Sequence, residues 1–332
     1  MKINRSYVRK MRYAIQWATF FMVTYAGCRF LFFARDLGNG MLPSVSRPSS
    51  VEGFMPIGAL MSLKLWLAEG IFDPVHPAAL TIFIGAILLA VILKKSFCSW
   101  ICPVGALSEA VWKGGAKLFG KNVIVPRYID YPLRSVKYLL TAFFVYIIVV
   151  KMSPSDIRGF LDTPYWKVSD IKLLKFFTEM SLTTQVTLLS LSALSLFYKN
   201  FWCRYLCPYG GFLGLMSVLS PVKIRRDEKA CIHCGLCAKN CPALLPVDRK
   251  ETIRSPECTG CLTCVSYCPA KGALDETVIG GRTVHPSVYA ALVVAVFFGL
   301  ILLSHVTGHW HSSVSPEELL SLVPVVDNLT HP

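Results

Sequence analysis

Long apolar runs separated by basic or mixed segments dominate the pattern of the chain. Five runs, at residues 11–33, 78–93, 136–150, 186–198 and 288–305, contain few charged side chains. A membrane-spanning helix needs about 20 apolar residues, within a range of roughly 17–25. Several runs reach that length only with flanking aromatic or polar residues. We predict a mainly α-helical protein with five transmembrane helices, the fifth over residues 286–305; buried core helices of a soluble protein are the alternative.

Two shorter apolar segments are expected on the outer side of the membrane. Residues 54–68 are apolar but too short to span comfortably, which predicts a re-entrant or interfacial helix. Residues 171–180 have apolar positions at helical spacing with interleaved lysines. This second pattern predicts an amphipathic helix on the outer leaflet.

Composition and charge support a membrane protein of defined orientation. The 332 residues are 54% apolar, and the net charge is +14. Most Lys and Arg residues fall before the first run, between the second and third, and between the fourth and fifth, which predicts that these segments are cytoplasmic. The N-terminus would be cytoplasmic and the C-terminus periplasmic in a bacterial inner (cytoplasmic) membrane. No nucleic-acid-binding motif accompanies the basic residues, which could also attract anionic lipid headgroups.

Eight cysteines in two matching runs carry the strongest chemical signal. The runs are Cys231-x2-Cys234-x2-Cys237-x3-Cys241-Pro242 and Cys258-x2-Cys261-x2-Cys264-x3-Cys268-Pro269. This is the ligand spacing of a bacterial two-cluster ferredoxin, in which the fourth cysteine of each run ligates the other cluster. One [4Fe–4S] cluster is therefore expected on Cys231, Cys234, Cys237 and Cys268. The second is expected on Cys258, Cys261, Cys264 and Cys241.

Zinc sites and disulfides are the alternative interpretations of these cysteines. Structural zinc sites use one set of four ligands, whereas the two runs here interlock. Cluster ligands must stay reduced, which fits the cytosol, and no cysteine falls in a predicted outer loop. Cys28 lies in the first predicted span, which we interpret as uncleaved despite its resemblance to a lipoprotein signal, and is expected to serve packing.

The remaining four cysteines form an internal repeat. Cys98-x3-Cys102-Pro103 follows the second predicted span, and Cys203-x3-Cys207-Pro208 follows the fourth. Two spans separate the motifs, which predicts a parallel repeat with a pseudo-two-fold axis along the membrane normal. Cysteines at i and i+4 share one face of a helical turn, so two such turns could bring four thiols together. We predict a further metal centre there; disulfides or packed thiols are the alternative.

These features define four predicted domains and two outer-face candidate sites. Residues 1–222 would form the membrane domain, 223–285 a two-cluster ferredoxin (α+β) domain, 286–305 the last helix and 306–332 a periplasmic tail. Quinol oxidation releases protons, and a histidine beside a carboxylate suits their acceptance. His76 with Glu69 or Asp73 is the candidate quinone site, although all three could simply cap interfacial helices.

The tail contains His305, His309 and His311 around Trp310. They could bind a metal or ligate a haem supplied by a partner, but surface histidines are the more ordinary interpretation. No Cys-x2-Cys-His motif is present, so covalent c-type haem is excluded. The chain has no catalytic triad, phosphate-binding glycine loop or nicotinamide fingerprint, which argues against hydride chemistry.

The paired Cys-x3-Cys-Pro motifs and the following double run resemble the membrane polyferredoxins of the NapH and NosR type. The resemblance covers residues 78–270. It implies an iron–sulfur electron-transfer subunit linking the quinone pool with a respiratory partner, such as a periplasmic cytochrome or flavoprotein or a cytoplasmic iron–sulfur protein. Related CcoG-type proteins share the motifs, so a metalloenzyme-maturation or redox-regulatory role is the rival. The chain departs from NosR-type proteins in lacking room for an external flavin domain before its first span.

Overall fold

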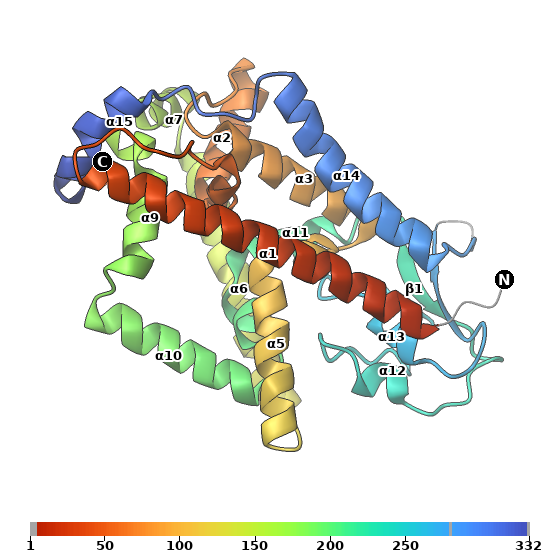
Figure 1. Ribbon diagram of the computed structural model, residues 1–332. Helices are drawn as coiled ribbons and strands as arrows, with labels where there is room; N and C mark the ends of the chain where they lie inside the picture. The colour runs from red at the N-terminus through yellow and green to blue at the C-terminus, as the bar shows by residue number, and fades with distance from the viewer. Residues whose placement is uncertain (1–4, 279–280, 331–332) are drawn as a thin grey trace. The chain divides into compact units, whose positions relative to one another are not determined.

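The computed structural model describes residues 5–278 and 281–330, and most of these are helical (Figure 1). The internal contacts divide the chain into two compact units. Unit 1 comprises residues 1–20, 86–141 and 190–298, and unit 2 comprises residues 21–85, 142–189 and 299–332. Every cysteine except Cys28 therefore belongs to unit 1.

The elements follow one another along the chain as helices interrupted by a small sheet. The longer helices are α1 (Arg5–Gly38), α2 (Pro56–Glu69), α3 (Pro77–Leu93), α5 (Pro103–Leu118), α6 (Arg127–Val145), α7 (Pro154–Leu161), α9 (Ser169–Thr178), α10 (Leu182–Phe197), α11 (Pro208–Met216) and α14 (Pro286–Val306). The short ones are η1 (Ser49–Phe54), α4 (Phe97–Trp100), η2 (Tyr146–Lys151), α8 (Pro164–Lys167), η3 (Trp202–Leu206), α12 (Leu236–Lys239), α13 (Thr263–Tyr267), α15 (Pro316–Leu322) and η4 (Val323–Asn328). Proline begins many of them because its fixed φ suits the first helical position, where no amide donor is needed.

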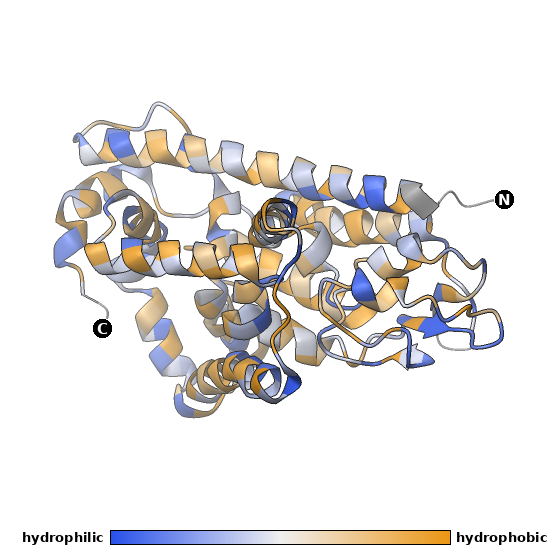
Figure 2. Cartoon of the chain, turned by 90° about the horizontal axis from the view of Figure 1, so that it is seen from below, coloured by the Kyte–Doolittle hydropathy of each residue, from blue (hydrophilic) through white to orange (hydrophobic). Residues whose placement is uncertain are grey.

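Three helices of the described residues are long and apolar enough to cross a membrane. They are Tyr7–Gly38 within α1, Arg127–Lys151 formed by α6 and η2, and α14. Hydrophilic residues gather at the end of α1 next to the N-terminus (Figure 2). The protein is thus a membrane-associated helical protein, as predicted, but three of the five predicted spans meet these criteria.

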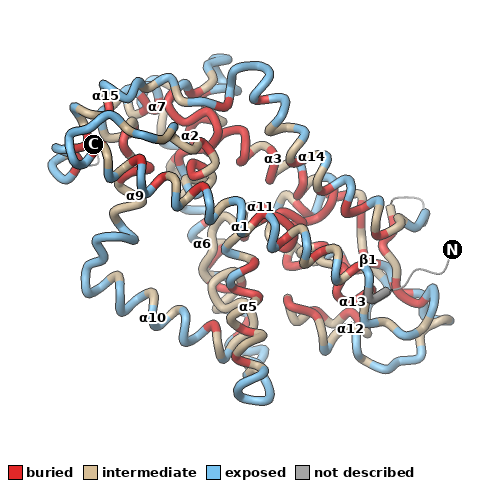
Figure 3. Tube along the Cα trace, viewed as in Figure 1, coloured by how far each residue is buried: buried red, intermediate tan, exposed pale blue. Residues whose placement is uncertain are grey.

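The other two predicted spans fall on helices of different character. The helix α3 has 17 residues and is mostly buried, whereas α10 is mostly exposed (Figure 3). The helix α3 ends before Lys94, whose φ of 61° belongs to the left-handed region that stops a helix. The helices α9 and α10 meet at a bend of 76°, so together they form either a broken span or a re-entrant loop.

The boundary between the units falls within the five helices at the predicted spans. The helices α1, α3, α6, α10 and α14 each contain residues of both units, so the chain passes between the units five times. Unit 1 contains 25 basic and nine acidic residues, and unit 2 contains nine basic and 11 acidic residues. The strong excess of positive charge is therefore confined to the unit that contains the cysteine motifs.

A three-stranded antiparallel sheet organises the cysteine runs of unit 1. The strand order is β2 (Thr252–Ile253), β1 (Lys223–Arg226) and β3 (Leu274–Thr277). In the central strand, Ile224 pairs with Ile253 on one side and with Glu276 on the other. The first cysteine run follows β1, and the second lies between β2 and β3. Both runs are therefore connected to strands of the same sheet. All three strands lie within residues 223–285, the segment predicted as the ferredoxin domain.

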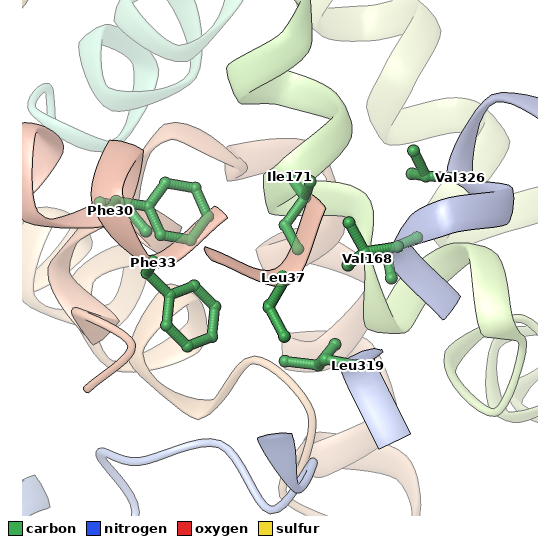
Figure 4. Packing of buried hydrophobic residues seen from close by; sticks show 9 residues of the cluster. Phe30, Phe33, Leu37, Val168, Ile171, Leu319 and Val326 are labelled. Atoms are coloured by element: carbon green, nitrogen blue, oxygen red, sulfur yellow. The ribbon is translucent and has the colours of Figure 1, made fainter. Parts of the chain in front are cut away.

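Unit 2 has its own hydrophobic core (Figure 4). The core side chains come from α1, η1, α9 and the C-terminal helices: Phe30, Phe33, Leu37, Val51, Val168, Ile171, Leu319, Val323 and Val326. Phe30 and Phe33 stack with their ring centroids 6.0 Å apart. Because α15 and η4 supply three of these residues, the C-terminal segment is a packed part of unit 2.

Candidate metal centres

Two cavities in unit 1 are lined by the cysteine runs. Cavity 1 is bordered by Cys231, Cys234, Cys237 and Cys268. Cavity 2 is bordered by Cys241, Cys258, Cys261 and Cys264. Each cavity thus takes three cysteines from one run and the last cysteine from the other, and each has about 370 Å³ of empty space, part of it open to solvent. The cavities group the cysteines in the two sets expected from the sequence; the assignment of a cluster to each set stays a prediction.

The backbone takes the same unusual shape in both runs. His233 and Gly235, on either side of Cys234, have φ values of 54° and 69°. The equivalent residues around Cys261 are Gly260 and Leu262, with φ values of 59° and 54°. Non-glycine residues seldom adopt such left-handed conformations. Because these conformations occur at matching positions, the two cysteine loops have the same backbone conformation around Cys234 and Cys261.

The donor set of each cavity suits a cluster rather than a single ion. In the part of the chain that the structure describes, no three His, Cys, Asp or Glu side chains converge on one metal position. A tetrahedral zinc ion draws four ligands to one point, whereas a [4Fe–4S] cluster is held by four thiolates that surround it. Four thiols around an open space match the second arrangement.

A buried arginine in the wall of cavity 1 adds an independent sign of fit. Only 6% of Arg226 is exposed, and its Nε and Nη1 atoms have no hydrogen-bond partner in the part of the chain that the structure describes. Its Nη2 atom lies 3.6 Å from Oε1 of Glu228, a residue whose side chain is 65% exposed. An unsatisfied buried cation is costly, and an anionic iron–sulfur cluster would supply the missing negative charge.

Cavity 2 has an apolar wall with a buried lysine nearby. None of the described residues that line this cavity is charged. Lys94 is 1% exposed, its Nζ atom has no hydrogen-bond partner, and its Cβ lies 3.3 Å from the position that a Cβ on Gly260 would occupy. Burial lowers the pKa of Lys94 to about 8, and the Cys258 thiolate opposes this effect. A cluster in cavity 2 would give this ammonium group a counter-charge.

The repeated Cys-x3-Cys-Pro motifs have matching local structures. Cys98 lies in α4 and Cys203 in η3, each within one short helical turn. Cys102 and Cys207 are the N-cap residues of α5 and α11, and proline follows each as the first helical residue. The amide of Gly210 donates a hydrogen bond to Sγ of Cys207 at 3.3 Å. The sequence repeat is therefore also a structural repeat.

The four thiols of the repeat are close enough to influence one another electrostatically. Burial raises the pKa of Cys98 to about 12 and that of Cys102 to about 11. Burial also raises the pKa of Cys203 strongly, and the other three thiols add to the increase. All thirteen cysteines of the chain are free in the structure, which does not support the disulfide interpretation. Buried thiols of this kind become ligands when a bound metal stabilises their thiolates.

Hydrogen bonds join the first repeat motif directly to the second cysteine run. The hydroxyl of Ser99 donates to the carbonyl of Thr259 at 2.8 Å, and the indole N–H of Trp100 donates to the carbonyl of Gly260 at 3.0 Å. Both donors lie between Cys98 and Cys102, and both acceptors lie between Cys258 and Cys261. The loop that borders cavity 2 is thus bonded to the helical turn that carries the repeat cysteines.

A buried network of charged side chains also connects the Cys-x3-Cys-Pro repeat with the second cysteine run. Glu257, next to Cys258, accepts hydrogen bonds of 2.6 Å from Nζ of Lys137 and from the hydroxyl of Tyr138. Nζ of Lys95 lies 3.9 Å from the same carboxylate and donates to the carbonyl of Gly210 at 3.3 Å. Although burial raises the pKa of Glu257, Lys95 and Lys137 lower it to about 2. The ionised carboxylate therefore holds two cations between the repeat and the second run.

The outer-face histidine predicted from sequence is buried in unit 2. His76 is fully buried, and its Nε2 atom lies 2.8 Å from the carbonyl oxygen of Trp166. Because a carbonyl oxygen can only accept a hydrogen bond, Nε2 carries a proton. The other ring nitrogen, Nδ1, lies 3.4 Å from Oε1 of the fully buried Glu52. Neither of these two atoms has a hydrogen-bond partner among the described residues, and a proton between them would prevent a lone pair from facing a carboxylate. His76 and Glu52 are therefore placed to share one proton.

The two predicted carboxylate partners have other contacts. Asp73 is buried and accepts from the amides of Val75 and His76 at 2.9 and 3.3 Å, so it fixes the backbone before α3. Glu69 forms an ion pair with Arg158 and does not contact the imidazole in any recorded interaction. The carboxylate beside the ring is Glu52, which lies 24 residues earlier in the chain. Glu52 follows a proline-containing loop, and nothing in the sequence around it indicates that its carboxylate is buried beside His76.

The tail histidines lie near one another but form no complete ligand set. The rings of His305 and His311 have centroids 5.1 Å apart, and His305 is also 5.1 Å from Trp310. The ring of His309 contacts Phe72, with centroids 4.7 Å apart. These contacts anchor the C-terminal segment of unit 2, and metal or haem binding there stays a prediction.

Two family models match the cysteine motifs. A model described as a 4Fe-4S binding domain matches residues 75–124 and 183–227, and one described as a 4Fe-4S dicluster domain matches residues 223–269. The first match contains the two Cys-x3-Cys-Pro motifs, and the second contains the two cysteine runs. No solved structure matches the chain.

Several known proteins are similar to the chain. YccM of Escherichia coli (strain K12), named for electron transport, is 42% identical over 294 residues, covering 86% of this chain and 82% of YccM. The ferredoxin-type protein NapH of the same strain is 25% identical over 227 residues, covering 63% of this chain and 70% of NapH. The regulatory protein NosR of Stutzerimonas stutzeri is 24% identical over 173 residues, covering 51% of this chain and 22% of NosR.

The fold, the cysteine cavities and these similarities define a membrane-associated iron–sulfur protein of electron transport. The chain belongs to the family of NapH/NosR-type membrane polyferredoxins. The family expected from the cysteine motifs is thereby confirmed.

Proposed function

We propose that the protein is an integral membrane subunit that passes electrons between the quinone pool and a redox partner through cysteine-bound iron–sulfur centres. The observation that carries this proposal is the pair of hydrogen bonds from Ser99 and Trp100 to the second cysteine run. They connect the repeat motif to cavity 2, and cavities 1 and 2 are connected by their exchanged cysteines. Three cysteine sets thus form a continuous series within unit 1.

The two cavities would hold one [4Fe–4S] cluster each. Cys231, Cys234, Cys237 and Cys268 would bind the first, and Cys258, Cys261, Cys264 and Cys241 the second. The clusters supply one-electron redox chemistry when bound. The chain itself supplies thiolate ligands, a positive charge at Arg226 or Lys94, and in cavity 2 an apolar wall; charge and solvent exposure of these kinds set the potential of a cluster.

The four repeat cysteines would hold a third centre. Their mutual electrostatic influence, their burial and their location within the matched 4Fe-4S binding model support this assignment. Thiolate ligands at the N-termini of α5 and α11 would also be favoured by the helix dipoles. Lys95, which lowers the pKa of Cys98 and Cys207 against the effect of burial, would offset part of the negative charge.

Five membrane crossings would place this series on the cytoplasmic side. The chain passes between the units five times, and unit 1 has most of the basic residues, as the positive-inside rule requires of a cytoplasmic face. In this topology α3 and α10 would complete their short spans with flanking residues, the N-terminus would be cytoplasmic and the C-terminus periplasmic.

The quinone would be oxidised or reduced next to unit 2, with His76 and Glu52 as the proton-exchanging pair. Quinol oxidation releases protons, and a base that already shares a proton with a carboxylate can accept or return one. Asp73 would hold the backbone of His76 in place. Glu69, paired with Arg158, would have no direct part.

A maturation or regulatory role is the second candidate. Relatives named regulatory protein NosR match half of this chain. In that role the same centres would undergo slow, substoichiometric redox changes, and loss of the protein would impair metal loading of another enzyme.

Iron and sulfide stoichiometry with EPR, on anaerobically purified protein titrated with a quinol analogue, tests the proposal. We expect clearly more than eight irons per chain, a lower content in the Cys98→Ala/Cys203→Ala variant, and reduction of the centres by quinol. About eight irons in both proteins would contradict the third centre. Failure of quinol to reduce the centres would favour the maturation role.

A further inference from the structure

The cysteines at the edge of cavity 1 are more exposed than those of cavity 2. Cys234 is exposed, and so are the neighbouring residues Ile232, at 62%, and Leu236, at 37%. In cavity 2, by contrast, Cys241 and Cys264 are buried. The centre expected in cavity 1 is therefore the one that another protein can approach through a small apolar surface.

Exposed basic residues lie next to this exposed edge in the sequence. Five exposed basic residues lie within two positions of residues that line the cavity, and we call them the basic rim: Lys229, Lys239, Arg249, Lys250 and Lys271. Arg225 is also exposed, but it alternates with Arg226 along β1 and so points to the opposite face of the sheet.

The acidic residues near the rim do not cancel its charge. Asp227 and Glu228 are the exposed acidic residues of the described chain at the same sequence distance from the lining. Asp227 accepts from the backbone amide of Lys229 at 2.9 Å, and Glu228 lies 3.6 Å from Arg226. Asp248, in the cavity wall, lies 3.9 Å from Arg249. The five basic residues outnumber these three acidic residues, which leaves a net positive charge on the residues at and next to the lining of cavity 1.

We propose that cavity 1 and the basic rim form the docking face for a small acidic electron-carrier protein. This inference rests on the proposed function, because it needs a redox centre in cavity 1. In the transfer step the carrier loses one electron and the iron–sulfur centre gains one, and no bond or proton changes place. Opposite charges steer such partners together, and weak redox complexes bury small interfaces of under about 1,200 Å².

Anionic lipid headgroups are the competing ligand for a basic surface. The carrier is favoured because the rim residues adjoin the lining of an exposed cysteine cavity in the sequence, and because Ile232 and Leu236 offer an apolar contact surface beside Cys234. A lipid surface covering the same edge would separate the centre from any soluble partner.

Stopped-flow reduction of the full-length protein, in nanodiscs of zwitterionic lipid, by a reduced acidic flavodoxin tests the proposal. We expect the second-order rate constant of the wild type to fall steeply as salt is added. Lys239→Glu/Lys250→Glu should lower it at least tenfold at low salt, within the 10–10³-fold range of electrostatic steering, and the two proteins should converge at high salt.

The matched control is Lys117→Glu/Lys121→Glu, which makes the same change of net charge at exposed residues beyond the cavity. Its rate constant should stay near the wild-type value, and all proteins should contain the same amount of iron. Equal rates in the two variants would overturn the proposal. So would rim variants that lose binding to anionic vesicles while keeping their rate with flavodoxin, which would assign the rim to lipid. Failure of the proposed function looks different, because the wild type itself would then show no reducible iron–sulfur signal with dithionite.

Discussion

Single positively charged side chains determine the local electrostatic potential at the cysteine cavities. Arg226, in the wall of cavity 1, and Lys94, near cavity 2, are both buried, and each has side-chain donor atoms without a hydrogen-bond partner among the described residues. A fixed positive charge stabilises the reduced, more negative form of a cluster and so raises its potential. These residues belong to the electrostatics of the centres even though neither is a ligand.

Replacing Arg226 by Gln should lower the midpoint potential of one of the two ferredoxin-type centres and leave the other unchanged. A tenfold change in the ratio of reduced to oxidised centre corresponds to about 59 mV for one electron, and we expect a shift of that order. Arg226→Lys, which keeps the charge, should restore most of the potential. EPR-monitored redox titration measures both variants, and equal potentials in all three proteins would contradict a counter-charge role.

The His76–Glu52 pair predicts a pH dependence of stability. Although burial lowers the pKa of His76, Glu52 raises it above its ordinary value. The folded protein therefore keeps a proton that the unfolded chain has released, so its stability should fall as pH rises through the folded pKa. In Glu52→Gln, burial would remain the largest influence and lower the pKa of His76, helped by Arg47 and opposed by Asp170, so stability should rise with pH instead.

Melting temperatures measured across the range from about pH 4 to pH 9 test this reversal of slope, because the two proteins titrate on opposite sides of the unfolded pKa of histidine. Asp36→Asn is a suitable control, because it also removes one carboxylate, and Asp36 is half-buried with Ser44 as its hydrogen-bond partner. Slopes of the same sign in wild type and Glu52→Gln would show that the pair does not share a proton.

At the scale of elements, the docking of the second cysteine run depends on one glycine. A Cβ on Gly260 would lie 2.2 Å from the hydroxyl of Tyr289, which donates to the carbonyl of Leu93 at 2.5 Å. Gly260 also has a φ of 59°, a conformation that costs L-residues about 1–2 kcal/mol. The close approach explains why this loop position is occupied by glycine where the first run has His233.

Gly260→Ala should therefore destabilise the protein and lower its iron content, with an overpacking cost of about 1–3 kcal/mol beyond the backbone strain. Gly272→Ala is the matched control, because Gly272 has a φ of 72° and a Cβ there would meet nothing within 4 Å. Thermal unfolding and iron analysis compare the two. Equal losses in both variants would mean that backbone strain alone matters.

The sequence predicted the cysteine elements well because their spacing is local. The cysteine sets, the matching repeat turns and the helices near residues 54–68 and 171–180 could all be read from motifs and periodicity. The partner of His76 could not, since Glu52 is brought to it by packing between distant segments. The lengths of α3 and α10 could not be predicted either. The helix α3 ends before Lys94, and α10 is separated from α9 by a bend.

At the scale of the whole molecule, the uneven charge predicts an orientation. Unit 1 has 25 basic residues and unit 2 has nine, and the chain passes between the units an odd number of times. A phosphatase reporter, active only outside the cytoplasm, should therefore be active when fused after Asp327 and inactive when fused after Lys121. Activity at both positions, or at neither, would contradict five crossings.

The crossed ligand sets also have a consequence for biogenesis. Cavity 1 needs Cys268, which is synthesised 31 residues after Cys237, and cavity 2 needs Cys241 from the run that precedes it. Cavity 2 has all four thiols only after residue 264 has been synthesised, and cavity 1 only after residue 268. If each cavity binds a cluster, delivery of iron and sulfide would therefore have to wait until most of the second run has been synthesised, and a chain interrupted before residue 264 would lack a complete site of either kind.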